Sequence, residues 1–406
     1  MKVIFFIHTF PNLSETFIRN QIVGLLDLGV EIEIISIFEG EVFNDSTLLR
    51  IKSSCSISYL LGKKNNSLRH IKLKTCFQFI KNFSSLENKL KLFQELYSLI
   101  TCRNKSAVLE LFHIISRRPN LFVADVLLAH FVHAGYLAYF LREAGVFKVK
   151  LQASVCHGVE MSAHSYLKRW LPIYKKYLPK IELILPVSDF WKHKLIGWGV
   201  DKNLIHVHRM GIDIERFDFR PFSFSSDRSL RILSVGRNVE KKGFIYAISS
   251  LIKMPDVDYQ VIGVEDGAFS NHLELGHNIS LLGSRNQSQV YKALKWADVF
   301  LLPSVTAKNG DMEGLPVALM EAMACGKVVI STYHSGIPEL ISHLHNGLLC
   351  REKSVSDITE NIQRVRSDIE ASLTISLAAR RRVERLHDNR KLSYELKMLL
   401  ESYIVD

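Results

Sequence analysis

One short segment in the last quarter of the chain carries two acidic side chains at a spacing suited to ligand binding. The segment is EGLPVALMEAMACGKVVIS, residues 313–331, with Glu313 at its start and Glu321 inside an apolar run. Over eight residues a helix rises about 12 Å and turns a side chain by about 80°, so the two carboxylates can hold two ends of one extended ligand. A buried carboxylate needs hydrogen-bond partners. The apolar surroundings therefore favour a ligand site over the alternative, in which both acids lie on a solvated helix face.

The start of the same segment predicts a site for an anion. We expect Gly314 and Pro316 in the first turn of a helix, where glycine permits close approach to the backbone and proline loses no hydrogen bond. The unpaired N–H groups of a helix start and the helix dipole together suit a phosphate.

Basic side chains follow a strand in ILSVGRNVEKKGF, residues 232–244. We expect the strand to end at Gly236, with Arg237, Lys241 and Lys242 directly after it. Cations at this position neutralise a departing diphosphate by electrostatic stabilisation. The alternative is an exposed basic loop that binds nothing.

Two polar residues in the first half of the chain also follow strands. His157 comes at the end of ASVCH, where it is either a hydrogen-bonding group of an active site or a satisfied helix cap. In HTFPNLSETFI, Ser14 and Glu15 either cap the next helix, with Thr16 in its first turn, or Ser14 faces a ligand.

The histidines and cysteines lack the spacing of a metal site. His157, Glu160 and His164 do not have the H-E-x-x-H order, and His130 with His133 has no evident third ligand. The six cysteines form no CxxC pair, which indicates reduced thiols in a cytosolic protein.

The elements that position these residues are two series of short, apolar, β-rich runs. The first series is KVIFFIHTF, GVEIEIISIF, DVLLAHF, VKLQASVCHG and IELILPVS, and the second is LRILSVGR, YQVIGV, ISLLG, DVFLLPS and KVVISTY. Helical stretches separate the runs, which is typical of parallel α/β sheets. Residues 215–228 are rich in Phe, Ser and Asp without a clean period, and they indicate a linker.

The sequence therefore predicts an α/β fold with two doubly wound, Rossmann-like domains. We expect the first domain at residues 1–215 and the second at 229–385, with a terminal helix at 386–406. Open α/β sheets bind ligands at the carboxyl ends of their strands, and the residues singled out above fall at such ends.

Composition describes an ordinary globular chain with an excess of positive charge. The 406 residues are 47% hydrophobic and 23% charged, with a net charge of +11. No run of about 18 apolar residues occurs, and the start reads as a strand rather than a signal peptide. The charge indicates anionic partners such as lipid head groups, phosphorylated substrates or nucleic acid.

Most of that excess lies in residues 61–120, where twelve Lys and Arg stand against three Glu, a local charge of +9. The stretch IKLKTCFQFIKNFSSLENKLKLFQELYSLI has the apolar spacing of amphipathic helices. Three alternatives stay open for it: helices with a solvated basic face, docking on an anionic membrane surface, and binding of RNA or DNA.

Four segments resemble the C-terminal half of the family 4 glycosyltransferases, which are retaining enzymes of the GT-B fold. The segments are SVGRNVEKKG, LPS followed by EGLPVALMEAMACG, SGIPELI and NGLL. The N-terminal segments HTFPNLSETFI, AHFVHAG, HGVEMS and HVHRMGID look like the branch that includes the colanic acid and exopolysaccharide (amylovoran-type) transferases. The resemblance spans the chain apart from about residues 40–115. It implies that the two Rossmann-like domains face each other across a cleft and that the helix at 386–406 packs back toward the first domain. Two loops depart from it, since many members carry Gly-Gly where this chain has PNLSE, and Asn-Gly-Val-Asp where it has RMGID.

The resemblance implies roles for four catalytic residues. Arg237 and Lys242 would contact the diphosphate of the donor, Glu313 would hydrogen-bond the transferred sugar, and His157 would sit beside that sugar.

It also implies a set of donor-binding residues. Glu321 would hold the ribose hydroxyls, and the N–H groups of Gly314, Leu315 and Val317 would take the phosphates. Ser14 is assigned to the same set.

An Asp-x-Asp pair, Asp256 and Asp258, is similar to the motif with which another class of glycosyltransferase holds a divalent ion. These acids precede the strand YQVIGV, so we expect them at the amino edge of the sheet, whereas Arg237, Lys242 and Glu313 follow strands. A strand of about six residues separates the two edges by ~20 Å. We therefore predict a reaction with no metal and no other cofactor.

The implied function is a retaining hexosyltransferase that moves a sugar from a nucleoside-diphosphate donor to a lipid-linked oligosaccharide, in surface or exopolysaccharide biosynthesis. The expected partners are the donor, the lipid-linked acceptor and an anionic membrane surface, not nucleic acid. The expected location is peripheral, on the cytoplasmic face of the membrane. The alternatives are a sugar-nucleotide epimerase of the same fold and a non-catalytic basic protein that binds membranes or nucleic acid.

Overall fold

The computed structural model describes residues 1–41, 43, 45–63, 73–84, 88–117, 119–269 and 275–404. Its internal contacts divide the chain into two compact units, Met1–Arg209 with Arg390–Asp406, and Met210–Asn389. The segment 215–228, interpreted above as a linker, lies within the second unit.

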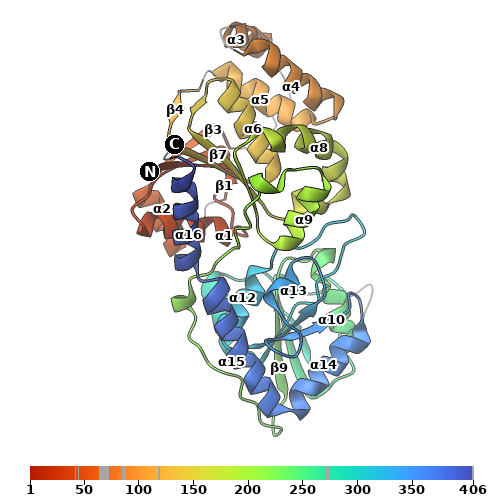
Figure 1. The fold of residues 1–406 in the computed structure, drawn as a ribbon. Coiled ribbons are helices and arrows are strands. Elements are labelled where there is room, and N and C mark those ends of the chain that lie inside the picture. The colour runs from red at the N-terminus through yellow and green to blue at the C-terminus, as the bar shows by residue number, and fades with distance from the viewer. Residues whose placement is uncertain are drawn as a thin grey trace. The chain divides into compact units, whose positions relative to one another are not determined.

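The first unit contains a six-stranded parallel sheet with strand order β3-β2-β1-β5-β7-β8 (Figure 1). Its strands are β1 (Lys2–Phe10), β2 (Glu31–Glu39), β3 (Ser56–Lys63), β5 (Val126–His130), β7 (Leu151–Cys156) and β8 (Leu183–Pro186). Its helices are α1 (Thr16–Asp27), α2 (Ser46–Ser54), α3 (Leu73–Ser84), α4 (Lys89–Thr101), α5 (Lys105–Arg117), α6 (Val132–Glu143), α7 (Val159–Ser162), α8 (His164–Tyr177), α9 (Asp189–Gly197) and α16 (Asn389–Ser402). Strands β4 (Phe122–Val123) and β6 (Phe147–Lys148) pair separately.

The middle strand β1 shows why this sheet forms. Its sequence KVIFFIHTF is apolar almost throughout, and residues 3–7 are all buried. Phe5 pairs with Ile34 of β2 on one side and with Leu128 of β5 on the other. A parallel strand covered on both faces needs such a continuous apolar run.

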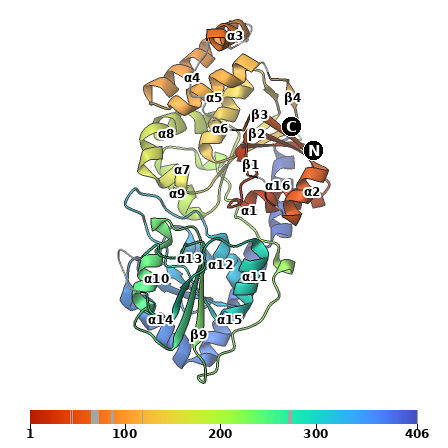
Figure 2. The same cartoon turned by 180° about the vertical axis from the view of Figure 1, so that it is seen from behind.

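The last helix, α16, lies in the first unit although it ends the chain. Figures 1 and 2 both show it beside α1 and α2. Leu396 and Leu400 of α16 are buried, and the Lys397 ammonium donates to the Leu28 carbonyl at 3.2 Å. The C-terminal segment is thus anchored by an apolar face and by one polar contact.

The second unit repeats the same design, with strand order β11-β10-β9-β12-β13-β14 and all pairs parallel. Its strands are β9 (Leu230–Val235), β10 (Val257–Ile262), β11 (Ile279–Leu281), β12 (Val299–Leu301), β13 (Val328–Thr332) and β14 (Leu348–Cys350). Its helices are α10 (Phe244–Leu251), α11 (Gln287–Trp296), α12 (Val317–Ala324), α13 (Ile337–Leu340), α14 (Val355–Ser367) and α15 (Ile369–Leu386).

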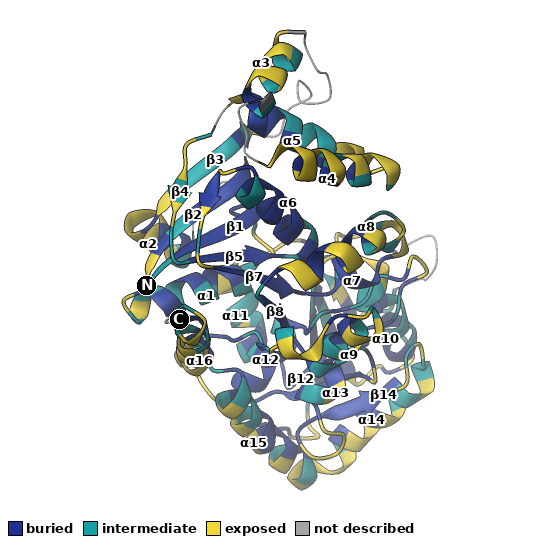
Figure 3. Ribbon diagram, turned by 45° about the horizontal axis from the view of Figure 1, so that its top comes forward, coloured by how far each residue is buried: buried dark blue, intermediate teal, exposed yellow. Residues whose placement is uncertain are grey.

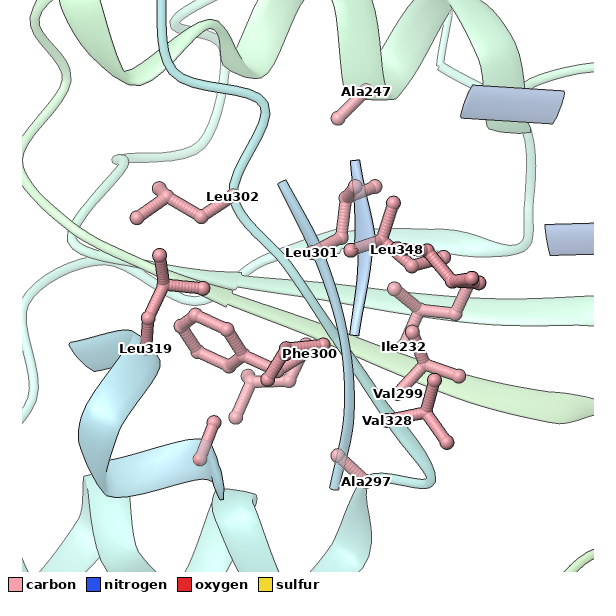
Figure 4. Packing of buried hydrophobic residues seen from close by; sticks show 14 of the residues in the cluster. Ile232, Ala247, Ala297, Val299, Phe300, Leu301, Leu302, Leu319, Val328 and Leu348 are labelled. Atoms are coloured by element: carbon pink, nitrogen blue, oxygen red, sulfur yellow. The ribbon is translucent and has the colours of Figure 1, made fainter. Parts of the chain in front are cut away.

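The core of the second unit lies between its sheet and the covering helices. Figure 4 shows Ile232, Phe300, Val328 and Leu348, one from each of four adjacent strands, together with Leu319 of α12. Each of these five residues has at most 1% of its surface exposed to solvent. Their removal from water is the main force that holds α12 against the strands.

Both sheets reverse their strand order at one point, between β1 and β5 and between β9 and β12. Ligands of open α/β sheets bind at the carboxyl ends of the strands that flank such a reversal. The predicted pair of Rossmann-like sheets is confirmed.

Exposure differs strongly along the first unit. Figure 3 shows the strands of its sheet mostly buried, whereas α3 and α4 carry long exposed stretches. No helix among the described residues is long and apolar enough to cross a membrane. Of the basic stretch 61–120, residues 64–72, 85–87 and 118 lie outside the described residues.

Candidate functional site

The carboxyl ends of four strands in the second unit bring its charged residues together. The loop after β9 carries Lys242, the loop after β12 carries Glu313, and the loops after β13 and β14 carry His334 and Glu352. Because parallel strands all end at one edge of a sheet, these residues from separate parts of the chain meet there.

Lys242 and Glu313 form an ion pair at this edge. Lys242 Nζ lies 2.8 Å from Glu313 Oε1, and their side chains are only 16% and 8% exposed. Burial alone raises the pKa of Glu313, but the positive charges of Lys242 and Lys241 outweigh burial and the net pKa is lowered. Glu313 is therefore held as a carboxylate beside a lysine.

The backbone of Glu313 is fixed by the two residues that follow β13. The Glu313 N–H donates to His334 Nε2 at 3.1 Å, and the Ser335 hydroxyl donates to the Glu313 carbonyl at 2.7 Å. Since Nε2 accepts, the ring proton of His334 lies on Nδ1, which is 2.6 Å from Glu352 Oε1. The Glu352 carboxylate thereby orients the imidazole, and the imidazole orients Glu313.

Further polar contacts fix the long loop between β12 and α12 at two more points. Lys241 Nζ lies 3.0 Å from Asp311 Oδ1 and donates to the Met312 carbonyl at 3.3 Å. Further back in the loop, the Thr306 N–H donates to Glu352 Oε2 at 2.8 Å. The loop that presents Glu313 is therefore held in place before any ligand binds.

Gly243, directly after Lys242, is required by the close approach of two loops. Its φ is +67°, and a Cβ built at this position would lie 1.9 Å from the Pro303 carbonyl oxygen. Only glycine permits both the left-handed backbone and this contact. Gly243 thus allows the β9 loop to pass close to the β12 loop, and this position brings Lys242 to Glu313.

Helix α12 begins later than the sequence predicts. Its first residue is Val317 and Pro316 precedes it as the cap residue, so the expectation that Gly314 and Pro316 form the first turn is wrong. Pro316 has an extended backbone with ψ of 113°, and a proline disfavours the helical region for the residue before it, so the helix starts only after both residues. Leu315 is buried while Val317 is half-buried.

Glu321 lies one turn into α12 and is half-buried rather than enclosed. Burial raises the pKa of its carboxyl to about 7, although the nearby charge of Arg216 opposes the shift. Within the described part of the chain, no side chain forms a hydrogen bond or ion pair with this carboxylate. Its environment suits hydroxyl donors from a ligand.

Arg237 extends from the end of β9 and is exposed. None of the described acidic side chains forms an ion pair with it. The Arg237 guanidinium is therefore available near this strand end to form an ion pair with a phosphate.

In the first unit, His157 follows β7 and is enclosed by aromatic rings. Its ring centroid lies 4.6 Å from that of Phe17 and 4.5 Å from that of Phe131. His157 Nε2 is 3.2 Å from Nδ1 of His130, while Nδ1 of His157 has no hydrogen-bond partner among the described residues. Burial lowers the pKa of His157 to about 3, so the imidazole is neutral at physiological pH.

The loop at His157 is held by a buried acid. Glu160 Oε1 accepts the N–H of His157 at 2.7 Å, and Oε2 accepts the N–H of Gly158 at 3.1 Å. Both oxygens of this carboxylate are used to shape the turn.

A second polar pair lies at the same edge of the first sheet. His8 Nε2, near the end of β1, is 3.3 Å from both carboxylate oxygens of Glu110 on α5. The ring of His133 on α6 lies 5.9 Å from that of His8. Burial lowers the pKa of His133 to about 3, so the His133 imidazole is neutral, like that of His157.

Ser14 does not cap a helix. The helix begins at Thr16 as predicted, but neither Ser14 nor Glu15 provides a side-chain cap, so the capping expectation is wrong. Instead the Ser14 hydroxyl and N–H both donate to Asn12 Oδ1, at 3.0 and 3.1 Å. Ser14 is exposed, and its assignment to the donor site stays a prediction.

Asp256 and Asp258 lie at the start of β10, at the amino edge of the second sheet. Asp256 forms an ion pair with Arg366 at 3.2 Å. Among the described residues, no group of three or more His, Cys, Asp or Glu side chains is arranged to hold a metal ion.

Sequence reasoning missed His334 and Glu352, which hold Glu313, and also His8 and Glu110. His334 directly precedes SGIPELI, one of the segments that carry the family resemblance, and that position was the available signal. The pairing of His8 with Glu110 had no such signal, because 102 residues separate them.

Comparisons with known proteins find similarity along nearly the whole chain. The family described as Glycosyl transferases group 1 matches residues 215–382. The chain is 36% identical over 413 residues to the amylovoran biosynthesis glycosyltransferase AmsK of Erwinia amylovora, covering 99% of each. It is 33% identical over 426 residues to the putative colanic acid biosynthesis glycosyltransferase WcaL of Escherichia coli, covering 99% of this chain and 100% of the relative. A crystal structure of Anabaena HepE in complex with UDP and glucose has a TM-score of 0.69 at 15% identity, over 98% of this chain and 99% of that one.

Proposed function

Because the chain belongs to the GT-B glycosyltransferases of exopolysaccharide biosynthesis, we propose that it transfers a hexose, with retention, from a nucleoside-diphosphate donor to a lipid-linked saccharide. The observation that carries this proposal is the buried ion pair of Lys242 and Glu313 at the strand ends of the second unit. It combines a cation for the diphosphate with a carboxylate for sugar hydroxyls.

The donor half of the proposal assigns roles to residues of the second unit. A lysine ammonium has three N–H donors, so Lys242 can keep its contact with Glu313 and also donate to a phosphate oxygen. Arg237 adds a second cation. The N–H groups of Gly314 and Leu315, which precede α12, and of Val317, its first residue, donate to the phosphates. Glu321 accepts the ribose hydroxyls. HepE, with its bound UDP and glucose, supports the choice of a nucleotide sugar as donor.

In the proposed reaction, the bond between the anomeric carbon and the diphosphate oxygen breaks first. The leaving diphosphate takes the electron pair and is stabilised by Arg237 and Lys242. The acceptor hydroxyl then bonds to the same face of the oxocarbenium-like carbon and passes its proton to a diphosphate oxygen.

Front-face departure is favoured because the two buried carboxylates that follow strands, Glu160 and Glu313, already have partners, and Glu321 is assigned to the ribose. Both carboxylate oxygens of Glu160 accept hydrogen bonds from backbone N–H groups, and Glu313 forms an ion pair with Lys242. A covalent route needs a carboxylate free to attack. Charge stabilisation by the two cations also removes the need for a metal ion in this mechanism.

Acceptor handling is assigned to the first unit. His157 also lies in this unit, beside the expected position of the transferred sugar. Its imidazole is neutral, and its Nδ1 has no hydrogen-bond partner among the described residues, so it can hydrogen-bond a hydroxyl of that sugar. The biosynthetic role named for AmsK and WcaL supports a growing saccharide as acceptor. We place the enzyme peripherally at the cytoplasmic membrane face, where a lipid-linked acceptor is reached.

The test is a panel of nucleotide sugars screened by thermal stabilisation, in which a ligand at 100 times its Kd adds about 2.7 kcal/mol. The binding donor is then incubated with and without lipid-linked saccharides from the same pathway. Release of nucleoside diphosphate only with acceptor, and a product with the donor's anomeric configuration by NMR, are expected. Conversion of the donor sugar without acceptor would instead indicate an epimerase, and an inverted product would exclude retention.

A further inference from the structure

Helix α4 in the first unit carries two separate apolar stripes on different faces. One stripe consists of Leu92 and Leu99, which are fully buried. The other consists of four residues at helical spacing whose exposure ranges from 59% to 74%, namely Leu90, Phe93, Tyr97 and Ile100. A helix needs only one apolar face to pack on its domain, so the second stripe calls for a different explanation.

The outer stripe is not created by a loosely placed helix. Glu95, on the inner side, accepts from the Tyr136 hydroxyl at 2.9 Å and forms an ion pair with Lys180 at 2.7 Å. Lys91 forms an ion pair with Glu143 at 2.6 Å. These contacts fix which face of α4 points inward, and the large apolar side chains of the outer stripe are left on the surface.

Helix α3 repeats this arrangement. Its inner side is anchored by Asn82, whose amide donates to the carbonyls of Ile115 and Ser116, and by Phe79, whose ring stacks on Phe112 at 4.3 Å. On its outer side Phe77 is 75% exposed and Ile80 is 65% exposed. Both helices pack on α5, and both leave aromatic and aliphatic groups outside.

Exposed lysines accompany the two outer stripes. On α3, Lys74 and Lys81 lie three residues before and four residues after Phe77, which places them on the adjoining face of the helix. On α4, Lys89 directly precedes Leu90. All three are exposed, and none of the ion pairs found among the described residues involves Lys74 or Lys89. Apolar groups with flanking lysines are the composition of helices that lie in the interface of an anionic bilayer.

We propose that the outer faces of α3 and α4 form a docking surface for an anionic lipid bilayer. The apolar residues Phe77, Ile80, Leu90, Phe93, Tyr97 and Ile100 enter the boundary between head groups and acyl chains, and Lys74, Lys81 and Lys89 contact the head-group phosphates. A second copy of the chain is a poorer occupant, because lysine is depleted in protein interfaces. This inference deepens the peripheral location given under the proposed function. The surface shares no residue with the proposed transfer site, so docking can be tested separately from transfer.

The experiment is flotation of the full-length protein with vesicles of phosphatidylcholine, with and without phosphatidylglycerol. We expect binding only when phosphatidylglycerol is present. A Phe93→Gln, Tyr97→Gln double variant should lose at least about tenfold in partition, since two aromatic groups no longer leave water. A Lys74→Gln, Lys81→Gln, Lys89→Gln variant should lose about a hundredfold at low salt and show little further loss when salt is added.

The matched control is Tyr394→Gln, Met398→Gln on α16, which removes two exposed apolar side chains, 56% and 47% exposed, from another helix of the same unit. This variant should float like the wild type. Thermal stabilisation by the donor should be the same in all these proteins, which separates docking from transfer. Equal flotation of the Phe93, Tyr97 variant and the wild type would overturn the proposal. It would equally be overturned by a wild-type dimer that ignores vesicles and dissociates on the same substitutions.

Discussion

The two sheets of this chain have the same strand order, yet their carboxyl edges carry different kinds of side chain. At the second sheet, Lys242, Glu313 and Arg237 place formal charges, and the Lys242–Glu313 pair is 2.8 Å apart. At the first sheet, His157 and His133 are buried, and burial lowers the pKa of each to about 3, so both are neutral. The formal charges of the second edge thus contrast with the two uncharged imidazoles of the first edge, where the Glu110 carboxylate is paired with His8.

The difference follows from how each edge compensates for burial. Desolvation opposes every buried charge. Glu313 keeps its charge because two lysines are close by, whereas the neighbours of His130 are other imidazoles, which lower its pKa further. The same topology thus holds a buried ion pair in one unit and neutral imidazoles in the other, which fits the proposed division between diphosphate and sugar contacts.

The largest expected effect comes from removing the cation of the charged edge. Lys242→Ala should lower kcat for transfer by roughly three orders of magnitude, because the leaving diphosphate loses its main stabilising charge. It should also cost about 3–5 kcal/mol of stability, since Glu313 is left buried without its partner. Steady-state kinetics and chemical unfolding measure the two effects.

Two controls separate these effects. Lys295→Ala breaks a surface ion pair with Asp218 and should leave both the stability and kcat nearly unchanged. The Lys242→Ala, Glu313→Ala double variant should regain stability but not activity. Full activity in the folded Lys242→Ala protein would contradict the assignment of charge stabilisation to this edge.

The next effect concerns the neutral edge. His157→Ala should lower transfer by about a hundredfold, because the sugar loses a positioned hydrogen-bonding group, while binding of nucleoside diphosphate stays unchanged. Calorimetry of the nucleotide alongside transfer kinetics makes the distinction. His193→Ala, an exposed histidine of α9, is the matched control. Loss of nucleotide binding in His157→Ala would remove the proposed division between the two edges.

A smaller effect is expected at Glu321. Burial raises the pKa of this carboxyl to about 7, so it is mostly protonated at pH 6 and mostly ionised at pH 8. Ribose hydroxyls donate to the ionised form, and donor affinity should therefore rise about tenfold as pH increases from 6 to 8. Glu321→Gln should bind with affinity that no longer varies over this range, and Glu321→Ala should bind about tenfold to a hundredfold more weakly, since a charged hydrogen bond is lost. A donor affinity that falls with rising pH would contradict the assignment of the Glu321 carboxylate to the ribose hydroxyls.

The smallest effect is expected from metal removal. Activity should survive excess EDTA and the Asp256→Asn, Asp258→Asn double change, because these acids lie at the opposite edge from Lys242 and Asp256 already pairs with Arg366. Transfer assays with and without chelator test this directly. An enzyme silenced by EDTA and restored by Mn²⁺ would show that the charged edge is incomplete without a metal.

Much of this arrangement could be predicted from the sequence, because strand formation depends on local apolar runs. Once KVIFFIHTF and LRILSVGR are recognised as parallel strands, whatever follows a strand must lie at the carboxyl edge. The strand-end positions of His157, Arg237, Lys242 and Glu313 therefore came from the order of residues alone. The prediction failed where a local pattern had two outcomes, as at Ser14, whose side chain bonds Asn12 rather than capping a helix.

Only the tertiary structure decided which of these residues touch. His334 contacts Glu313, which lies 21 residues before it, and Glu352, which lies 18 residues after it. Such pairings depend on the order of the strands in the sheet, and the periodicity of the sequence does not specify that order. The same limit applies to α4. Its sequence determines that apolar residues recur along two stripes, but the packing of Leu92 and Leu99 against the unit decided that Phe93 and Tyr97 face outward. Composition fixes how much apolar surface a helix has, whereas its neighbours in space fix which part of that surface is covered.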